Sequence, residues 1–236
     1  MAEPEQNAAP PSLDVYEAMR TARSVRRFRP DPVPDEVLAR CLEAATWAPS
    51  GSNYQAWRFV VLRSPEVRAV LGPAFREGWD WVRTSFYGEG WQRPDPDDNS
   101  PAARQTRAML HLVDNFENVP VYVLFCYRLT GFVSEFVEGG SIFPAMQNFL
   151  LAARAEGLGT VPSTWFTFAE DKLRALIGVP DEWRVAALVA VGWPMGGHGP
   201  VRRRPVRAVT ALDSWDTPFI EETEQATGRH EARAED

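Results

Sequence analysis

PSGSNYQAW, residues 49–57, joins an expected helix to an expected strand through small and amide side chains. Before it, apolar residues from Asp35 to Trp47 recur at helical spacing. After it, Trp57–Leu62 is a short apolar run rich in β-formers, which predicts a buried strand. Such a loop could present its backbone groups and its serine, asparagine and glutamine side chains to a planar ligand. An ordinary helix–strand connection explains the same residues equally well, with glycine and asparagine serving the turn.

Outward from this loop, the expected elements alternate irregularly. Helices are predicted near Leu13–Met19, after Ser64-Pro65 and over Gly139–Gly157; strands are predicted over Val119–Tyr127 and Val185–Trp193, with a last β-like run over Val206–Leu212. This order lacks the regular strand–helix alternation of a doubly wound sheet, and no Gly-x-Gly-x-x-Gly follows a strand. We therefore predict an α+β fold with a central mixed or antiparallel sheet flanked by helices.

The chain of 236 residues is long enough to bury a sizeable core. We expect residues 13–220 to form a single domain, between a flexible N-terminal tail at 1–12 and an acidic C-terminal tail at 221–236. Residues 74–118 contain Trp79, Trp81, Phe86, Tyr87 and Trp91, followed by a polar stretch, which favours an irregular lid or interface segment. The alternative is a helical hairpin that buries those aromatic side chains.

The formal net charge of −7 disfavours general binding to nucleic acids or to membrane surfaces. The sequence contains no apolar run of about 20 residues. Its acidic, polar start is unlike a secretory signal, and its two cysteines, Cys41 and Cys126, lie in apolar periodic segments. We accordingly expect a cytoplasmic protein with reduced cysteines in its core.

The usual side-chain arrangements for catalysis are missing from the sequence. The histidines, His111, His198 and His230, are far apart and match no metal-ligand spacing. Neither the Gly-x-Ser-x-Gly elbow nor the Walker phosphate loop occurs, and neither cysteine has a nucleophile motif around it. Either the protein is not an enzyme, or a bound cofactor performs the chemistry while side chains hold and tune it.

Two arginine clusters stand out in this acidic chain. Arg23, Arg26, Arg27 and Arg29 fall within seven residues, and Arg202–Arg204 are consecutive. Guanidinium groups bind phosphate bidentately, and the Ser24 hydroxyl could add a donor, so the clusters are candidate ligands for a dianionic phosphate. A solvated basic face, or pairing with the abundant carboxylates, explains the same composition.

Considered together, these stretches resemble the nitroreductase family. The matches run in family order over most of the chain: Arg23–Phe28, Pro49–Trp57, Gln147–Gly159, Gly192–Pro194 and Arg203–Pro205. The resemblance implies an intertwined homodimer with the nitroreductase-like fold and one FMN at each of two interface sites. It also implies ping-pong transfer of two electrons from NADH or NADPH to a small conjugated acceptor, such as a nitroaromatic or a quinone.

The resemblance also assigns roles to residues, and no catalytic side chain is among them. Phosphate and ribityl contacts fall to Arg23, Ser24, Arg26, Arg202 and Arg203. Pro49, Ser50, Gly51, Asn53 and Gln55 would line the isoalloxazine ring from the partner subunit, while Pro162, Ser163 and Thr164 would face the flavin N5 edge. A flavin-binding storage or sensor protein without turnover is the alternative, and an arginine module for an acidic partner is a third possibility.

The sequence departs from the family pattern at three positions. Ala22 stands where many members carry a first arginine, and Ala56 replaces the usual proline before Trp57. Trp165 occupies a position that is glycine in several members. We expect its larger side chain to narrow the pocket over the flavin.

Overall fold

The computed structural model describes residues 13–88, 90–131 and 134–220. The two predicted tails, at 1–12 and 221–236, lie outside these residues. The described residues form two compact units, with the division between Pro200 and Val201. The extent of a single domain over residues 13–220 stays a prediction.

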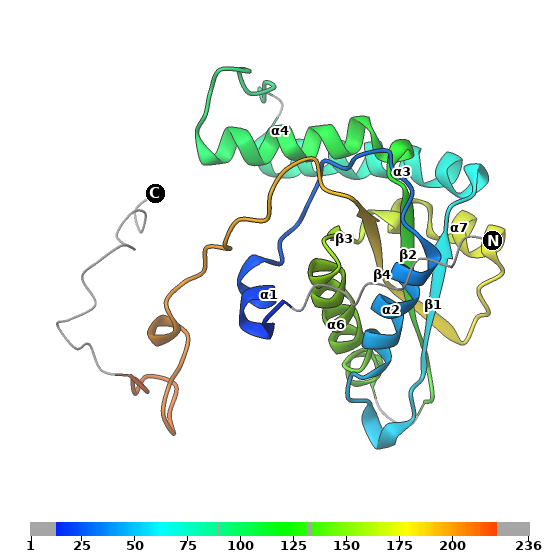
Figure 1. The fold of residues 1–236 in the computed structure, drawn as a ribbon, viewed down its shortest axis with the longest axis vertical. Coiled ribbons are helices and arrows are strands. Elements are labelled where there is room, and N and C mark those ends of the chain that lie inside the picture. Colours follow the sequence, from blue (N-terminus) through cyan, green and yellow to red (C-terminus); the bar gives the residue numbers. More distant parts are fainter. Residues whose placement is uncertain (1–12, 89, 132–133, 221–236) are drawn as a thin grey trace, which may run out of the picture. The chain divides into compact units, whose positions relative to one another are not determined.

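The first unit contains a four-stranded antiparallel sheet, which confirms the predicted α+β class (Figure 1). Its order is β1-β2-β4-β3, with bounds β1 Trp57–Leu62, β2 Val121–Arg128, β3 Gly159–Ser163 and β4 Trp183–Gly192. The first strand begins and ends where the sequence predicted. A register shift between Phe125 and Cys126 interrupts the pairing of β2 with β4.

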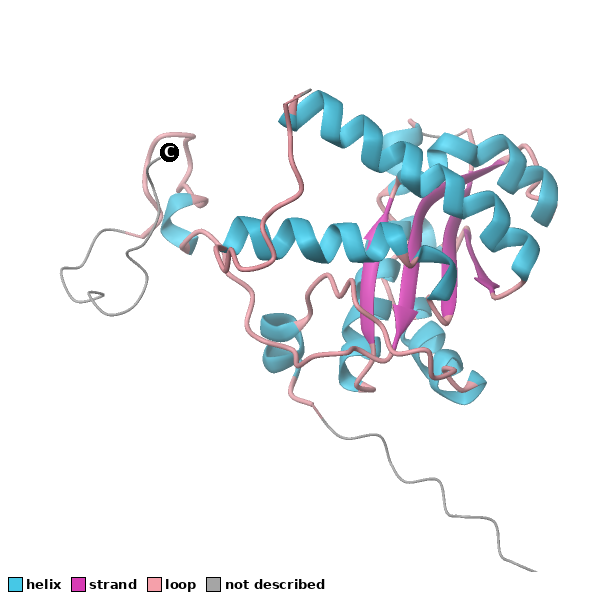
Figure 2. Cartoon of the chain, turned by 90° about the horizontal axis from the view of Figure 1, so that it is seen from above, coloured by secondary structure: helices cyan, strands magenta, loops and turns pink. Residues whose placement is uncertain are grey.

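The sheet separates two hydrophobic cores because alternate residues of a strand face opposite sides. Val121, Val123 and Phe125 belong to one core, whereas their neighbours on β2 belong to the other. The first core also contains side chains of α2 (Asp35–Thr46) and α6 (Ile142–Ala155), and the second those of α3 (Pro65–Val82), α4 (Pro101–Asp114) and α7 (Glu170–Ile177). Figure 2 shows the strands standing between helices.

Local sequence explains where several helices begin and end. Ser64 and Ser100 cap α3 and α4 through their hydroxyls, and each is followed by a proline in the first turn. Two short helices, α1 (Val15–Thr21) and α5 (Glu135–Gly139), are likewise capped by side chains. Gly178 ends α7 in the left-handed conformation, with φ 69°.

The expectation of an irregular segment over 74–118 is wrong. Helix α3 continues to Val82, a π-helical turn follows over Arg83–Tyr87, and α4 begins at Pro101. The segment is therefore helical, as in the alternative, but it does not bury the aromatic side chains as that alternative expected. Trp79 is buried, whereas Trp81, Phe86 and Tyr87 are exposed. A role of the segment as a lid or interface stays a prediction.

The sequence also misassigned smaller elements. Strand β3 and helix α7 were not predicted, and the long apolar helix is shorter than expected, at Ile142–Ala155. The predicted β-like run over Val206–Leu212 is wrong: these residues begin with a 3₁₀ turn over Val206–Ala208, and Ala211 forms an isolated bridge with Pro218.

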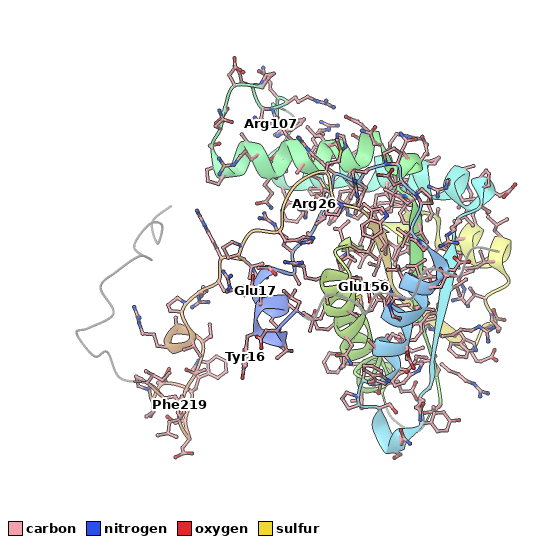
Figure 3. The ribbon with its side chains drawn as sticks, viewed as in Figure 1. Tyr16, Glu17, Arg26, Arg107, Glu156 and Phe219 are labelled. Atoms are coloured by element: carbon pink, nitrogen blue, oxygen red, sulfur yellow. The ribbon has the colours of Figure 1, made fainter. Side chains whose placement is uncertain are left out.

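An ion pair joins the middle of α2 to the C-terminal end of α6. The guanidinium of Arg40 donates two hydrogen bonds to Glu156, at 2.8 and 2.7 Å. Glu156 follows Ala155, the last residue of α6, and Figure 3 labels it between α6 and α2. The pair fixes the helices that carry the first core.

Both cysteines are free and buried, in agreement with the prediction. Burial raises the pKa of the Cys41 thiol to about 12 and that of Cys126 to about 11. Among the described helices, none is long and apolar enough to cross a membrane.

Candidate functional site

The first arginine cluster is hydrogen-bonded to the ends of two strands. The Val25 N–H donates to the carbonyl of Thr160 on β3 at 2.8 Å, and the Arg29 N–H donates to the carbonyl of Trp193 after β4 at 2.8 Å. Because Gly159 pairs with Gly192 across these strands, both contacts lie at one end of the sheet. The cluster is therefore held by backbone bonds and is not a loose basic face.

Gly159 and Gly192, at this end of the sheet, allow the arginine segment to pack closely against β3 and β4. A Cβ atom on Gly159 would lie 2.7 Å from Val25 Cγ1. A Cβ atom on Gly192 would lie 2.9 Å from Pro120 Cδ and 3.1 Å from Phe28 Cδ1. Both glycines are thus required by close packing against the arginine segment or its neighbours.

A cavity of about 350 Å³ opens beside this segment. Arg26 lines it together with Pro162, Ser163 and Thr164, which are all predicted site residues. The remaining lining side chains are mainly apolar: Phe75, Met109, Leu112, Phe143, Met146, Val161, Trp165, Ala186 and Ala187. A cavity with an apolar wall and few polar groups suits a flat organic ligand.

Arg26 is a half-buried cation whose Nε atom has no partner among the described residues. Its Nε atom is buried without a hydrogen-bond partner, and neither Arg26 nor Arg23 forms an ion pair within the described residues. Burial, followed by the charge of Arg23, lowers the pKa of Arg26. Figure 3 labels Arg26 on the segment between α1 and α2. An anion bound here would satisfy the buried donor and relieve the repulsion.

Trp165 closes one side of the cavity. A Cβ atom on Gly78 of α3 would lie 2.6 Å from the Trp165 ring, and the Phe75 ring lies 5.6 Å away, edge to face. The Ser163 hydroxyl accepts a hydrogen bond from the Trp165 N–H at 3.1 Å, which orders the turn after β3. The indole is thus held between α3 and the end of β3.

The loop over residues 49–55 has a strained, ordered backbone. Ser52, Asn53 and Gln55 have φ between 51° and 54°, a region that residues other than glycine seldom adopt. The Gln55 N–H donates to the Ser50 hydroxyl at 3.0 Å, and the Gln55 side-chain amide donates to Asn53 Oδ1 at 3.0 Å. Non-glycine residues with positive φ gather at functional sites, which favours the binding interpretation of this loop.

This loop borders a second cavity, of about 340 Å³. Ser50, Gly51 and Gln55 line it, together with residues from the end of β2 and the region of α5 and α6, whereas Pro49 and Asn53 do not. None of the loop residues lines the cavity beside Arg26.

One chain therefore does not bring all the predicted site residues together. The first cavity is lined by Arg26, Pro162, Ser163 and Thr164, and Arg23 and Ser24 lie on the same segment as Arg26. The second cavity is lined by Ser50, Gly51 and Gln55, whereas Pro49 and Asn53 line neither cavity. Arg202 and Arg203 belong to the second unit, where Arg203 donates to the Arg202 carbonyl at 2.8 Å. Their role stays a prediction.

Sequence reasoning missed the apolar side chains of the first cavity. Met109 and Leu112 come from α4, and Phe143 and Met146 come from the beginning of α6. At helical spacing, such residues are indistinguishable from ordinary core positions. The described residues contain no group of three or more potential metal ligands.

The fold and the site together define an α+β protein with an arginine segment beside an apolar cavity. The chain belongs to the nitroreductase family, generally oxidoreductases, which matches residues 19–193. An "NADH dehydrogenase" of Thermus thermophilus is 30% identical over 209 residues, covering 84% of this chain and 96% of the relative. The rat "Iodotyrosine deiodinase 1" is 26% identical, covering 82% of this chain and 67% of the relative.

Solved structures agree with this placement. A putative nitroreductase of Desulfovibrio desulfuricans, solved in complex with FMN, has a TM-score of 0.62 and 26% identity. The match covers 86% of this chain and 99% of that structure. The nitroreductase-like fold expected from the sequence is thereby confirmed.

Proposed function

We propose that this protein is an FMN-dependent oxidoreductase, which passes two electrons from NADH or NADPH to a small conjugated acceptor such as a nitroaromatic or a quinone. The observation that carries the proposal is the buried, unpartnered Arg26 Nε atom at the edge of an apolar cavity. The family membership and the FMN-bound relative support the same cofactor.

The described residues fit FMN at two places. Arg23 and Arg26 are unpaired cations next to the Ser24 hydroxyl, which suits a phosphate. Pro162, Ser163 and Thr164 border the apolar cavity, which suits the flavin ring. Arg202 and Arg203 would complete the phosphate contacts.

FMN, when bound, supplies hydride transfer, and this chain's residues bind it and shape its surroundings. The arginines neutralise the phosphate, and the apolar side chains around the cavity exclude water from the ring. Trp165 limits the space available to an acceptor. No side chain is required as an acid or base.

The active form would be a homodimer. In one chain, the loop of Ser50, Gly51 and Gln55 lines a different cavity from Arg26, so a second copy is needed to bring the loop to the flavin. Large apolar side chains on α1, after α2 and on α5 are exposed, including Tyr16 at 78%, Trp47 at 73% and Phe136 at 91%. Exposed apolar area of this kind marks interfaces. In this dimer, Pro49 and Asn53 would approach the flavin with the rest of the loop.

The visible spectrum of the purified protein tests the proposal. Flavin absorption that bleaches within seconds of anaerobic addition of NADH or NADPH is the expected result, followed by reoxidation by an acceptor. A protein that binds FMN but keeps it oxidised would be the storage or sensor alternative. A protein that fails to bind added FMN would contradict the proposal altogether.

Single arginine substitutions test the phosphate assignment. Arg23→Ala and Arg203→Ala should each weaken FMN binding by roughly 1.5–3 kcal/mol, since each removes a charge-assisted hydrogen bond. Fluorescence titration with FMN measures the affinity. Arg58→Ala, which removes an exposed arginine of β1, is the matched control and should bind FMN like the unaltered protein.

A further inference from the structure

His198 lies beside the arginine segment with both ring nitrogens buried and unpartnered. Neither Nδ1 nor Nε2 has a hydrogen-bond partner within the described residues. The residue is flanked by Gly197 and Gly199, and a Cβ atom on Gly199 would lie 3.5 Å from the Arg23 guanidinium. Buried polar atoms are nearly always satisfied, so this imidazole, like the Nε atom of Arg26, indicates a missing ligand.

The groups around His198 are cationic or neutral. Arg154 comes from α6 and donates to the Thr21 hydroxyl at 2.9 Å, while Arg23 follows α1. Burial lowers the pKa of His198 most, and the charges of Arg154 and Arg23 lower it further; the nearby backbone of Thr21, whose position does not meet the geometry of a hydrogen bond, raises it. Within the described residues, no carboxylate is among the groups that shift it.

Protonation of His198 is disfavoured when the site holds no anion, because it would add a cation near Arg154 and Arg23. A dianionic phosphate beside Arg23 and Arg26 reverses that balance, since its charge favours the imidazolium and its oxygens accept the ring N–H. Ligand binding and proton uptake are then linked.

We propose that His198 is a third ligand of the FMN phosphate, beside Arg23 and Arg26, and that it takes up a proton when the phosphate binds. This rests on the proposed function, because FMN supplies the phosphate. His198 thereby makes flavin affinity dependent on pH and distinguishes FMN from riboflavin, which has no phosphate.

The direction of the pH dependence follows from the linkage. The pKa of His198 is higher in the FMN-bound protein than in the free protein. The affinity for FMN is therefore greatest at pH values below the pKa of the free protein, and it falls as the pH rises through the pKa of the bound protein. A difference of one pKa unit between the two forms gives about a tenfold change in the dissociation constant. The flavin phosphate itself titrates near pH 6, so the comparison is made above that pH.

The experiment compares FMN dissociation constants of the unaltered protein and His198→Gln from pH 6.5 to 8.5, by quenching of flavin fluorescence. Glutamine keeps a hydrogen-bond donor but does not titrate. The dissociation constant of His198→Gln should exceed that of the unaltered protein about tenfold at pH 6.5. This ratio should fall to a constant, smaller value at pH 8.5. Calorimetry in two buffers of different ionisation enthalpy should show extra proton uptake only with the unaltered protein.

Two controls separate this role from a structural one. His111→Gln removes another partly buried histidine, on α4, and should leave both the affinity and its pH dependence unchanged. For riboflavin, the ratio between the dissociation constants of His198→Gln and of the unaltered protein should not change with pH. Thermal unfolding of each variant shows that it is folded.

Identical affinities and pH profiles for the unaltered protein and His198→Gln would overturn the proposal while leaving the flavin assignment standing. A pH-dependent ratio that is equally large for riboflavin would also overturn it, because the phosphate would then have no part in the effect. Failure of the unaltered protein to bind FMN at any pH would overturn the proposed function and this inference with it.

Discussion

At the residue scale, the candidate site depends on two complementary features: a cation without a partner and a glycine without a side chain. Arg26 is buried at Nε and unpaired, and Gly159 lets Val25 approach β3 closely enough for the backbone bond to Thr160. The sequence predicted the arginines from their clustering. It gave no signal for His198, because a lone histidine in a glycine-rich loop has no pattern to recognise.

Gly159→Ala should displace the arginine segment. The new Cβ would lie 2.7 Å from Val25 Cγ1, so the segment must move, at a stability cost of about 1–3 kcal/mol for overpacking. We also expect weaker FMN binding, because Ser24 and Arg26 move with Val25. Chemical denaturation and FMN titration measure the two effects.

Gly90→Ala is the matched control for this change. A Cβ there meets nothing within 4 Å, so stability and FMN affinity should be retained. Full FMN affinity in Gly159→Ala would show that the docking of the segment does not position the phosphate ligands.

The buried Cys41 thiol makes stability fall at high pH. Folding raises the pKa of this thiol from 9.0 to about 12. Its contribution to the free energy of unfolding is therefore fully present below pH 9 and is lost as the pH rises toward 12. Between pH 8 and pH 10, this thiol should remove about 1.4 kcal/mol from the free energy of unfolding. Chemical denaturation at both pH values measures this loss of unfolding free energy in the unaltered protein and in Cys41→Ala. The loss should be smaller in Cys41→Ala, and equal losses in the two proteins would refute the assignment to this thiol.

At the element scale, the prediction of secondary structure succeeded where the hydrophobic periodicity agrees with the residues that begin and end an element. Asp35–Thr46 and Trp57–Leu62 have clear helical and strand patterns, and both were predicted closely. It failed over residues 74–118, where a polar stretch between two helices made the whole segment look irregular. Strand β3 was missed because Gly159 and Pro162 are poor strand formers, and its pairing with β4 is visible only in three dimensions.

The end of α7 offers a test at this scale. Gly178 has φ 69° and open space around a would-be Cβ, so its requirement for glycine is purely conformational. Gly178→Ala should lower the free energy of unfolding by roughly 1–2 kcal/mol. Gly51→Ala, also in open space but outside the left-handed region, should change it little. Equal effects of the two substitutions would contradict the assigned cap.

At the scale of the whole molecule, the proposed flavin site is divided between two copies of the chain. The arginine segment and the end of β3 border one cavity, and the loop of Ser50, Gly51 and Gln55 borders another. The family resemblance implied this division, whereas composition and spacing could not, since neither shows which segments of one chain are near each other. A dimer of twice 26.5 kDa is the expected species in solution.

The most direct measurement is the flavin content of a mixed dimer. Arg26→Glu introduces a negative charge that repels the phosphate. Gly51→Trp places a bulky side chain in space that is open in one chain, where the flavin held by the partner subunit would lie. Each variant alone should bind no FMN. A heterodimer of the two, purified through two different tags, should bind one FMN per dimer, because one of its sites receives the intact arginine segment from one chain and the intact loop from the other. A folded heterodimer without FMN would contradict the divided site.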